Sequence, residues 1–424
     1  ESVPGSDTGL FSGVPFLRKD SGPTEAGRLQ EFGSRLFKGN RPTVDSYFIQ
    51  RARAAGLRVL GRTTVPELGI GSSESALCGV TRNPWNLDRT TGGSTAGSAA
   101  AVAAGIVPIA SGGDGGGSIR IPASFCGLVG LNPSRGRVSG GPDQQDPWFG
   151  LARNFVMCRT VRDMAAALDV FSGPHPGDPF IIVQADRPYV SELSQPTGVL
   201  RIGVARTRWG AVDIEPDVMH AVDSTARLLE EMGHTVIDIE APFQVEDARK
   251  IWLGLRSLSS GSLEVSAQDM GRSLNAETLE PVTLKLNEYG KNLPPSYSRE
   301  VHEALRIMRL RVGEALHPFD IVVTPTMPTV AFQNGIYDTT NPTISAEDFM
   351  KAEAALYSQV SVFNITGQPS VSLPLAQSAD GLPIGVQIVS RFGEEATLVR
   401  VARDLEEAIP WAARRPPMFA GGPE

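Results

Sequence analysis

Apolar residues alternate along this chain between short runs bounded by glycine or proline and longer stretches with a helical period. The short runs predict strands at residues 14–17, 57–60, 106–110, 201–205, 235–239, 321–324, 370–373 and 385–389. The longer stretches predict helices at 46–55, 161–171, 216–232 and 246–258. Because helices lie between strands, we expect an α/β fold with a central mixed β-sheet covered by helices on both faces.

The chain has no obvious internal boundary. A length of 424 residues would suggest two or three domains. However, no charge run, low-complexity segment or Ser/Pro-rich linker divides it, so we expect a single domain over residues 1–424. The stretches 139–148 and 332–344 are predicted loops. Long loops in α/β proteins often bind ligands, and surface loops without a function are an equally weighted alternative.

Composition excludes several classes of partner. With 41% hydrophobic and 20% charged residues, the chain has the composition of an ordinary soluble globular protein. A net charge of −8 with scattered basic residues argues against binding to nucleic acid or an anionic membrane surface. The longest apolar stretch, 99–110, is too short to span a bilayer. Three widely spaced cysteines, Cys78, Cys126 and Cys158, predict buried, reduced thiols and favour a cytoplasmic location.

Two glycine-serine clusters, residues 92–98 and 112–118, are the most informative local feature. A small-residue helix at 99–105 and the strand at 106–110 separate them, so both loops should meet at one end of a helix–strand unit. Neither cluster continues as Gly-Lys-Ser or Gly-Lys-Thr, which argues against a phosphate-binding loop. Three glycines directly before Ser118 can instead direct backbone N–H groups at one point, as an oxyanion hole requires.

The sequence lacks the motifs that usually accompany a catalytic serine. No Gly-x-Ser-x-Gly elbow is present, and the five histidines share no motif and no zinc-ligand spacing. We therefore predict neither a metal nor a cofactor. A serine without histidine needs another base, and burial can make lysine suitable by lowering its pKa. Lys19, one of only six lysines, ends a short apolar strand. Taken singly, Lys19 would be a solvated lysine and Ser118 a loop or capping serine; the hypothesis depends on their joint occurrence with Ser94.

Residues 92–101 (GGSTAGSAAA) and 114–123 (DGGGSIRIPA) resemble the defining motif of the amidase signature family. Residues 13–20, 82–86 and 381–389 resemble the lysine strand, the pre-signature segment and the C-terminal strand of the same family. The matches occur in order over nearly the whole chain. The resemblance implies the amidase signature fold. It also implies a helical segment ahead of the lysine strand, which we expect to be missing because only 18 residues precede Lys19.

The resemblance implies a Ser-cisSer-Lys triad in which Ser118 is the nucleophile, Ser94 the bridging serine and Lys19 the base. The cis bond is expected at Gly93–Ser94 or at Ser94–Thr95, with the first favoured. Backbone N–H groups of Gly115, Gly116, Gly117 and Ser118 are expected to bind the oxyanion. The chain departs from the common pattern at Thr95, Ala96, Gly113 and Gly115, which leaves the triad groups in place but puts the oxyanion-hole geometry in question.

The function implied is amidohydrolysis of a neutral amide through an acyl-enzyme, with carbamates (urethanes) and esters as further substrates. Residues 64–69 and 175–180 most resemble enzymes that open nylon-type cyclic amide oligomers, and urethane-cleaving amidases are similar. One alternative is the glutamine-hydrolysing A-type subunit of an amidotransferase. A second is a non-catalytic nucleotide-binding protein.

The substrate pocket is expected to be mainly apolar, without an arginine cluster that could bind a carboxylate. It is predicted around residues 69–70, the loop 139–148 and the segment 332–363, with these residues as candidates: Gly69, Ile70, Trp148, Phe149, Phe332, Ile336, Tyr337 and Phe363. The alternative is that these side chains belong to the core. The expected partner is a small amide or carbamate, and a homodimer is left open.

Overall fold

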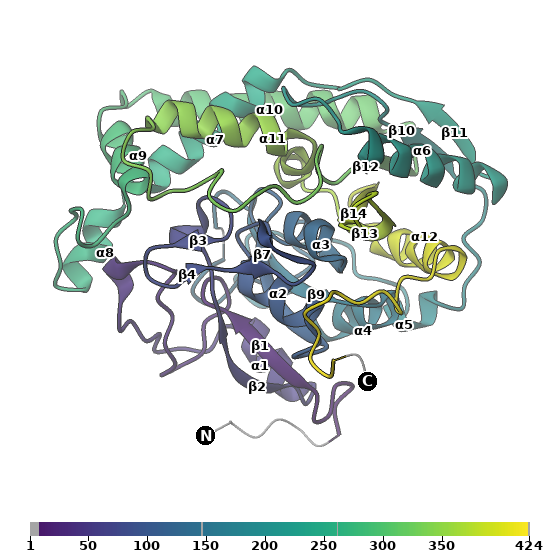
Figure 1. Cartoon of the computed structure of the whole chain (residues 1–424), viewed down its shortest axis with the longest axis horizontal. Helices are drawn as coiled ribbons and strands as arrows, with labels where there is room; N and C mark the ends of the chain where they lie inside the picture. Colours follow the sequence, from purple (N-terminus) through teal and green to yellow (C-terminus); the bar gives the residue numbers. More distant parts are fainter. Residues whose placement is uncertain (1–7, 146, 261, 423–424) are drawn as a thin grey trace.

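A ten-stranded β-sheet runs through the middle of the molecule in the computed structural model, which describes residues 8–145, 147–260 and 262–422 (Figure 1). The strands follow the order β11 (Thr235–Asp238), β10 (Arg201–Val204), β12 (Ile321–Pro325), β14 (Pro383–Ser390), β13 (Ser370–Gln377), β8 (Val129–Asn132), β9 (Arg153–Cys158), β7 (Ile109–Asp114), β1 (Pro15–Lys19) and β2 (Arg58–Thr63). Strand pairs β10–β11, β10–β12, β1–β7 and β1–β2 are parallel, and the others are antiparallel. The predicted mixed sheet is confirmed.

Helices cover both faces of this sheet. Side chains alternate along a strand, so Ile321 and Val323 of β12 point to one face and Val322 to the other. The first two residues pack in one core cluster with α4 (Val161–Phe171), α6 (Pro216–Glu231) and α12 (Glu395–Ala408). Val322 packs in a second cluster with α7 (Val245–Ser260), α9 (Pro281–Lys291), α10 (Tyr297–Leu316) and α11 (Ala346–Thr366). The two-faced arrangement expected from the sequence is therefore confirmed.

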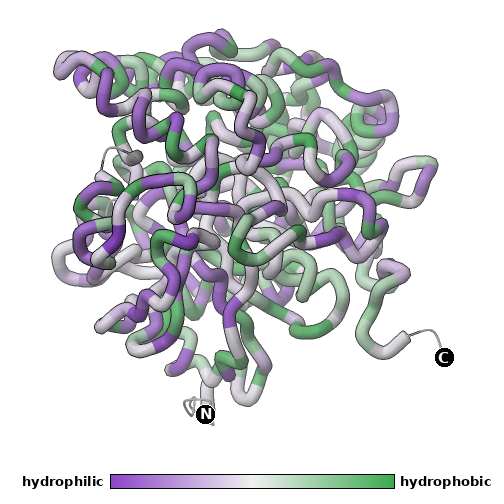
Figure 2. Tube along the Cα trace, turned by 60° about the vertical axis from the view of Figure 1, so that its left-hand side comes forward, coloured by the Kyte–Doolittle hydropathy of each residue, from purple (hydrophilic) through white to green (hydrophobic). Residues whose placement is uncertain are grey.

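Amphipathic helices surround the core. Hydrophobic and hydrophilic residues alternate along the outer helices, as expected when only one side of a helix is buried (Figure 2). In α6 the buried positions Val218, Val222 and Leu229 follow the helical period. The apolar positions whose spacing predicted this helix are thus the positions that it buries.

The first helix–strand unit determines where the candidate residues lie. Strand β1 runs parallel to β7 with Phe16 opposite Ile109, so the carboxyl ends of both strands reach the same edge of the sheet. Lys19 is the last residue of β1. Helix α2 (Ala96–Ala103) begins within the first glycine-serine cluster, two residues after Ser94, and α3 (Arg120–Cys126) begins two residues after Ser118, the end of the second cluster.

Several elements differ from the prediction. The strand expected at 106–110 is β7, Ile109–Asp114, because Gly112 and Gly113 continue the strand instead of forming the loop. The prediction missed β8, β9 and four helices of the C-terminal half, α9 to α12. The remaining short elements are α1 (Tyr47–Ala54), α5 (Tyr189–Glu192), α8 (Leu263–Asp269), η1 (Arg35–Phe37), η2 (Glu67–Gly69), β3 (Glu74–Ser75), β4 (Gly79–Val80), β5 (Arg82–Asn83) and β6 (Asn86–Thr90).

Both predicted loops are irregular. Residues 332–344 contain neither a helix nor a multi-residue strand, and 139–148 contain none among their described residues, Asp146 lying outside the described part. Cys126 and Cys158 are buried free thiols, but Cys78 is exposed, so the prediction of buried cysteines is wrong at that position. Within the described ranges, no helix is both long and apolar enough to cross a membrane.

Candidate active site

The Lys19 side chain is buried at the carboxyl end of β1 and is 2% exposed. Its ammonium nitrogen Nζ lies 2.9 Å from Ser94 Oγ and donates to the carbonyl oxygen of Gly113 at 3.2 Å. Burial lowers the pKa of Lys19 to about 7; the carboxylate of Asp114 opposes this effect and the charge of Arg256 adds to it. A substantial fraction of Lys19 is therefore a neutral amine near neutral pH, as a general base requires.

Ser94 lies in a backbone segment that only glycine neighbours allow. The peptide bond Gly93–Ser94 is cis, as predicted. A methyl group at Gly93 would lie 2.6 Å from the carbonyl oxygen of Gly71 and 2.2 Å from that of Ser72. A methyl group at Gly69 would lie 3.2 Å from Ser94 Oγ. The residues 69–72 thus form a wall that packs directly against the serine.

Ser118 is half-buried in the loop between β7 and α3. Thr95 donates its backbone N–H to the Ser118 carbonyl oxygen at 3.3 Å, which ties the two glycine-serine clusters together. Ser118 and Ser94 both line one cavity with Lys19. The structure therefore brings the three residues of the predicted triad to a single site.

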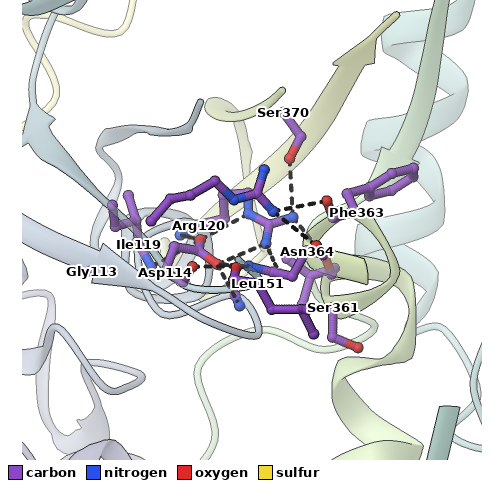
Figure 3. A network of polar contacts seen from close by, with 12 residues as sticks. Gly113, Asp114, Ile119, Arg120, Leu151, Ser361, Phe363, Asn364 and Ser370 are labelled. Atoms are coloured by element: carbon purple, nitrogen blue, oxygen red, sulfur yellow. Dashed lines mark hydrogen bonds and ion pairs between the residues drawn. The ribbon is translucent and has the colours of Figure 1, made fainter. Parts of the chain in front are cut away.

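An ion pair between Asp114 and Arg120, both fully buried, holds the loop that contains Ser118. Asp114 accepts hydrogen bonds from the Gly117 N–H at 2.7 Å and from Asn364 Nδ2 at 2.9 Å. Arg120 also donates to Ser370 Oγ at 3.1 Å, and Figure 3 shows these side chains converging on the pair. Burial alone would raise the pKa of Asp114, but Arg120 and the hydrogen bonds hold that pKa well below its ordinary value. Asp114 is therefore an anion that fixes the loop.

The cavity has a volume of about 330 Å³. Its walls combine aromatic and aliphatic side chains with glycine backbone, and the apolar lining residues include Phe32, Leu68, Ile121, Trp148, Trp252, Met350 and Ala354. Two charged residues besides Lys19 also line it: Arg256 from α7 and Glu353 from α11. Within the described residues, no group of three His, Cys, Asp or Glu side chains could hold a metal ion.

Only some of the residues predicted for the pocket line the cavity. Gly69 and Trp148 lie in the cavity wall, as do Gly115 and Gly116. Ile70 and Phe363 do not line the cavity, because both are buried in the second core cluster, 3% and 0% exposed. Phe332 is also outside the wall and packs edge-on against Phe125 in another cluster.

The remaining aromatic and aliphatic candidates were also misplaced. Ile336 is 58% exposed and Phe149 37% exposed, while Tyr337 contacts Phe332 away from the cavity wall. Each lies in an irregular loop, where sequence alone does not give the direction of a side chain. The core alternative thus holds for Ile70 and Phe363, and Phe332 and Tyr337 pack against a third core cluster, whereas Ile336 and Phe149 are exposed.

The sequence reasoning missed the wall that α7 and α11 provide. Residues 350, 353, 354, 357 and 361 of α11 all line the cavity, and their spacing is that of one helical face. On α7, Trp252 and Arg256 are four residues apart and line it as well. The helical period at 346–366 was the available signal, but this stretch is apolar on most sides and its pattern is weak.

Comparison with known proteins agrees with this geometry. The profile of the amidase family matches residues 1–399. The chain belongs to the amidase signature family. It is 37% identical to the 6-aminohexanoate-cyclic-dimer hydrolase of Paenarthrobacter ureafaciens over 97% of this chain and 86% of that protein.

Two solved structures of the family are similar to this chain to different degrees. The structure of 6-aminohexanoate cyclic dimer hydrolase complexed with substrate superposes with a TM-score of 0.93 at 36% identity and covers 97% of this chain and 88% of the other. A glutamyl-tRNA(Gln) amidotransferase subunit from Thermotoga maritima superposes with a TM-score of 0.74 at 27% identity, covering 99% and 88%. As an amidase signature enzyme, the protein is a hydrolase that cleaves amide bonds, which rules out the non-catalytic nucleotide-binding alternative.

Proposed function

We propose that this amidase cleaves a neutral amide through an acyl-enzyme formed on Ser118, with Ser94 as the bridging serine and Lys19 as the base. The observation that supports this most strongly is the 2.9 Å contact between Lys19 Nζ and Ser94 Oγ, together with the burial that lowers the pKa of Lys19 to about 7. Strongly perturbed pKa values cluster at functional sites, which agrees with this assignment of Lys19.

In the proposed reaction, neutral Lys19 takes a proton from the Ser94 hydroxyl while Ser94 takes one from Ser118. Ser118 Oγ then forms a bond to the carbonyl carbon, and the carbonyl π electrons move onto oxygen. Collapse of this intermediate breaks the C–N bond as the relay returns a proton to the leaving amine. Water attacks the resulting ester by the same relay, releasing the acid and restoring Ser118.

The oxyanion is proposed to be bound by backbone N–H groups of the loop before α3. Gly115 and Gly116 line the cavity beside Ser118 and are the strongest candidates, with the Ser118 N–H as a third. Gly117 was expected to contribute as well, but its N–H donates to Asp114 Oδ1 at 2.7 Å. We therefore assign Gly117 to fixing the loop. Losing one oxyanion donor typically lowers kcat about 100- to 1000-fold.

The proposed substrate class is a neutral amide with apolar flanking groups, with urethanes and esters as further substrates. Two features support this choice: the aromatic and aliphatic walls of the 330 Å³ cavity, and the likeness to enzymes named for the 6-aminohexanoate cyclic dimer. A cyclic aliphatic diamide is therefore the first compound to test.

The amidotransferase alternative is less well supported. Free glutamine presents an α-ammonium and an α-carboxylate, and each would need a charged partner in the pocket. Arg256 already donates to the Gly69 carbonyl oxygen, and Glu353 already accepts the Gly71 N–H. Similarity is also lower to the amidotransferase structure than to the cyclic-dimer hydrolase, with TM-scores of 0.74 and 0.93.

Covalent labelling with a fluorophosphonate tests the nucleophile. Wild-type enzyme should become labelled, and Ser118→Ala should lose both the label and turnover, because no acyl-enzyme can form. Ser98→Ala is a matched control, since Ser98 Oγ donates to the Ser111 carbonyl oxygen at 2.8 Å and does not line the cavity. Unchanged labelling of Ser118→Ala would refute the assignment.

Three broader expectations stay proposals. Strands from residue 15 to residue 390 join one sheet, which supports a single domain that limited proteolysis should leave intact. The buried free thiols of Cys126 and Cys158 support a reducing, cytoplasmic location, which cell fractionation can test. Sedimentation analysis can test a homodimer.

A further inference from the structure

Two oppositely charged side chains lie in a cavity whose walls are otherwise largely apolar, and the proposed relay uses neither of them. Arg256 comes from α7 and Glu353 from α11. Glu353 is 6% exposed and Arg256 is half-buried. Burying charges is costly unless they are paired and hydrogen-bonded. The hydrogen bonds that Arg256 and Glu353 make therefore show which parts of the cavity wall these two side chains hold in place.

Arg256 connects two walls of the cavity. Its Nη2 donates to the carbonyl oxygen of Gly69 at 3.2 Å, and its guanidinium lies 4.5 Å from the centre of the Trp148 ring. Trp148 in turn lies over Gly115, in the loop before α3 that is proposed to bind the oxyanion. A methyl group added at Gly115 would lie only 3.2 Å from the Trp148 ring. One guanidinium thus contacts both the wall beside Ser94 and the residue that covers Gly115.

Glu353 holds the same wall two residues further along. Its Oε1 accepts the Gly71 N–H at 3.2 Å. Arg256 and Glu353 therefore grip the backbone on either side of Ile70, whose side chain is anchored in the core. The segment that they hold lies close to the bridging serine, because a methyl group at Gly93 would meet the Gly71 carbonyl oxygen and one at Gly69 would meet Ser94 Oγ.

We propose that Arg256 and Glu353 are positioning residues that clamp the segment 69–71 and Trp148 around the two reactive serines. This inference rests on the proposed function, because it concerns the placement of Ser94 and of the oxyanion loop. The clamp acts through Gly69 and Trp148, so it affects the rate of the chemical step more than the affinity for substrate. Misplacing reacting groups by about 1 Å can lower a rate roughly 100-fold.

The clamp also affects the electrostatics of the base. The charged groups that act on Lys19 are Asp114, at the end of β7, and Arg256, on α7. Asp114 raises the pKa of Lys19 and Arg256 lowers it, while Glu353 and Tyr357 face Arg256 from α11. Removing the positive charge of Arg256 should therefore raise the pKa of Lys19 and move the acidic limb of the kcat–pH profile to higher pH. A role in folding alone would not move that limb.

The test compares Arg256→Gln, Arg256→Lys and Glu353→Gln using a neutral anilide, with a circular-dichroism spectrum for each. Arg256→Gln should lower kcat about 10- to 100-fold with a smaller change in KM, and should move the acidic limb upward. Arg256→Lys keeps the charge but not the planar group that stacks on Trp148, so kcat should fall while the limb stays in place. Glu353→Gln keeps an oxygen that accepts the Gly71 N–H and should retain most of kcat, without an upward shift of the limb.

Arg272→Gln is the matched control. Arg272 is a half-buried arginine that donates to backbone carbonyls, among them that of Leu36 at 2.6 Å, but it does not line the cavity. It should leave kcat and the pH profile unchanged. A wild-type kcat and acidic limb in folded Arg256→Gln would overturn the inference, and if that variant does not fold, a wild-type kcat in Arg256→Lys would do so. Labelling of wild type but not of Ser118→Ala in the same series shows that such a failure concerns the clamp and not the proposed function.

Discussion

Lys19 Nζ and Ser94 Oγ lie 2.9 Å apart although 75 positions separate the two residues in the sequence. The contact forms where β1 ends beside the start of α2, and both side chains are almost fully buried. Burial makes the ammonium form of Lys19 unfavourable, and the hydroxyl of Ser94 gives the neutral amine a proton to accept. The pair thus has the contact that the proposed proton transfer requires.

The rate of the reaction should follow the titration of Lys19. Because the base must be neutral, kcat should rise with pH and level off above a pKa of about 7. Lys19→Ala should lower kcat about 100- to 10,000-fold near pH 7, the usual range for a lost general base. A pH–rate profile of wild type and variant measures both effects, and a profile that keeps its acidic limb in Lys19→Ala would contradict the assignment.

Lys19 should also make the folded enzyme less stable than it could be. The unfolded chain binds this proton with a pKa near 10.4 and the folded chain with one near 7, so the unfolded state holds more protons between these values. The penalty is full below pH 7 and disappears above about pH 10.4, at about 1.4 kcal/mol for each unit of pKa difference. Lys19→Met should therefore be more stable than wild type at pH 7, and the gain should shrink toward pH 10. Denaturant unfolding at both pH values measures it; a variant less stable than wild type at pH 7 would contradict the prediction.

Gly69 should not tolerate a side chain. Its φ of +70° is unfavourable for alanine, and the added methyl group would lie 3.2 Å from Ser94 Oγ. Gly69→Ala should therefore lower kcat at least about 10-fold by displacing Ser94. Gly198→Ala is the matched control, since Gly198 has a φ of +74° with no atom within 4 Å of the added methyl group. Equal losses of kcat in both variants would show that backbone strain, and not contact with Ser94, is responsible.

How far the sequence predicts this molecule depends on the element. Strands such as β10 and β12 were predicted because short apolar runs end at clear turn residues, and α4 was predicted with its bounds as observed. The mixed sheet followed from the alternation of such elements. Helices α10 and α11 were missed because α10 is rich in charge and α11 is buried on most of its surface, which weakens the helical period in both.

That Lys19, Ser94 and Ser118 lie at one site was easier to predict than the lining of the pocket, for a physical reason. Lys19 and the two serines follow strand ends and glycine loops, whose position at a sheet edge is set by local sequence. Whether Phe363 or Met350 faces the cavity depends instead on how α11 is rotated against α7, which local sequence does not encode. The sequence could not show that Arg256 and Glu353 hold the same segment, because both side chains contact backbone atoms there, at Gly69 and Gly71.

The Asp114–Arg120 pair should be necessary for stability as well as for activity. Asp114→Ala would leave the fully buried Arg120 without its counter-ion, a change that typically costs about 3–5 kcal/mol. It would also release the Gly117 N–H and with it the loop that contains Ser118. Thermal unfolding and fluorophosphonate labelling should both show a loss. Glu303→Ala, which breaks an exposed pair with Arg306, should leave Tm nearly unchanged, and a similar Tm for both variants would contradict the structural role of Asp114.

Substrate preference should follow the apolar walls of the cavity. Phe32, Trp148 and Trp252 offer aromatic surface to aryl or alkyl groups on either side of the scissile bond. Arg256 and Glu353 each already make a hydrogen bond to backbone, at Gly69 and Gly71, so binding the charged ends of glutamine would compete with these contacts.

We therefore expect kcat/KM for a neutral anilide, or for the cyclic dimer of 6-aminohexanoate, to exceed that for glutamine by roughly 100-fold or more, because moving the ammonium and carboxylate of glutamine from water into a largely apolar cavity is costly. Parallel assays of product amine and of ammonia measure the ratio, and asparagine serves as a second charged amide. A urethane with a good leaving group should fall on the neutral side of the comparison, since its carbonyl presents the same oxygen to the proposed donors at Gly115 and Gly116. A higher kcat/KM for glutamine than for the anilide would overturn the substrate proposal while leaving the roles of Ser118 and Lys19 intact.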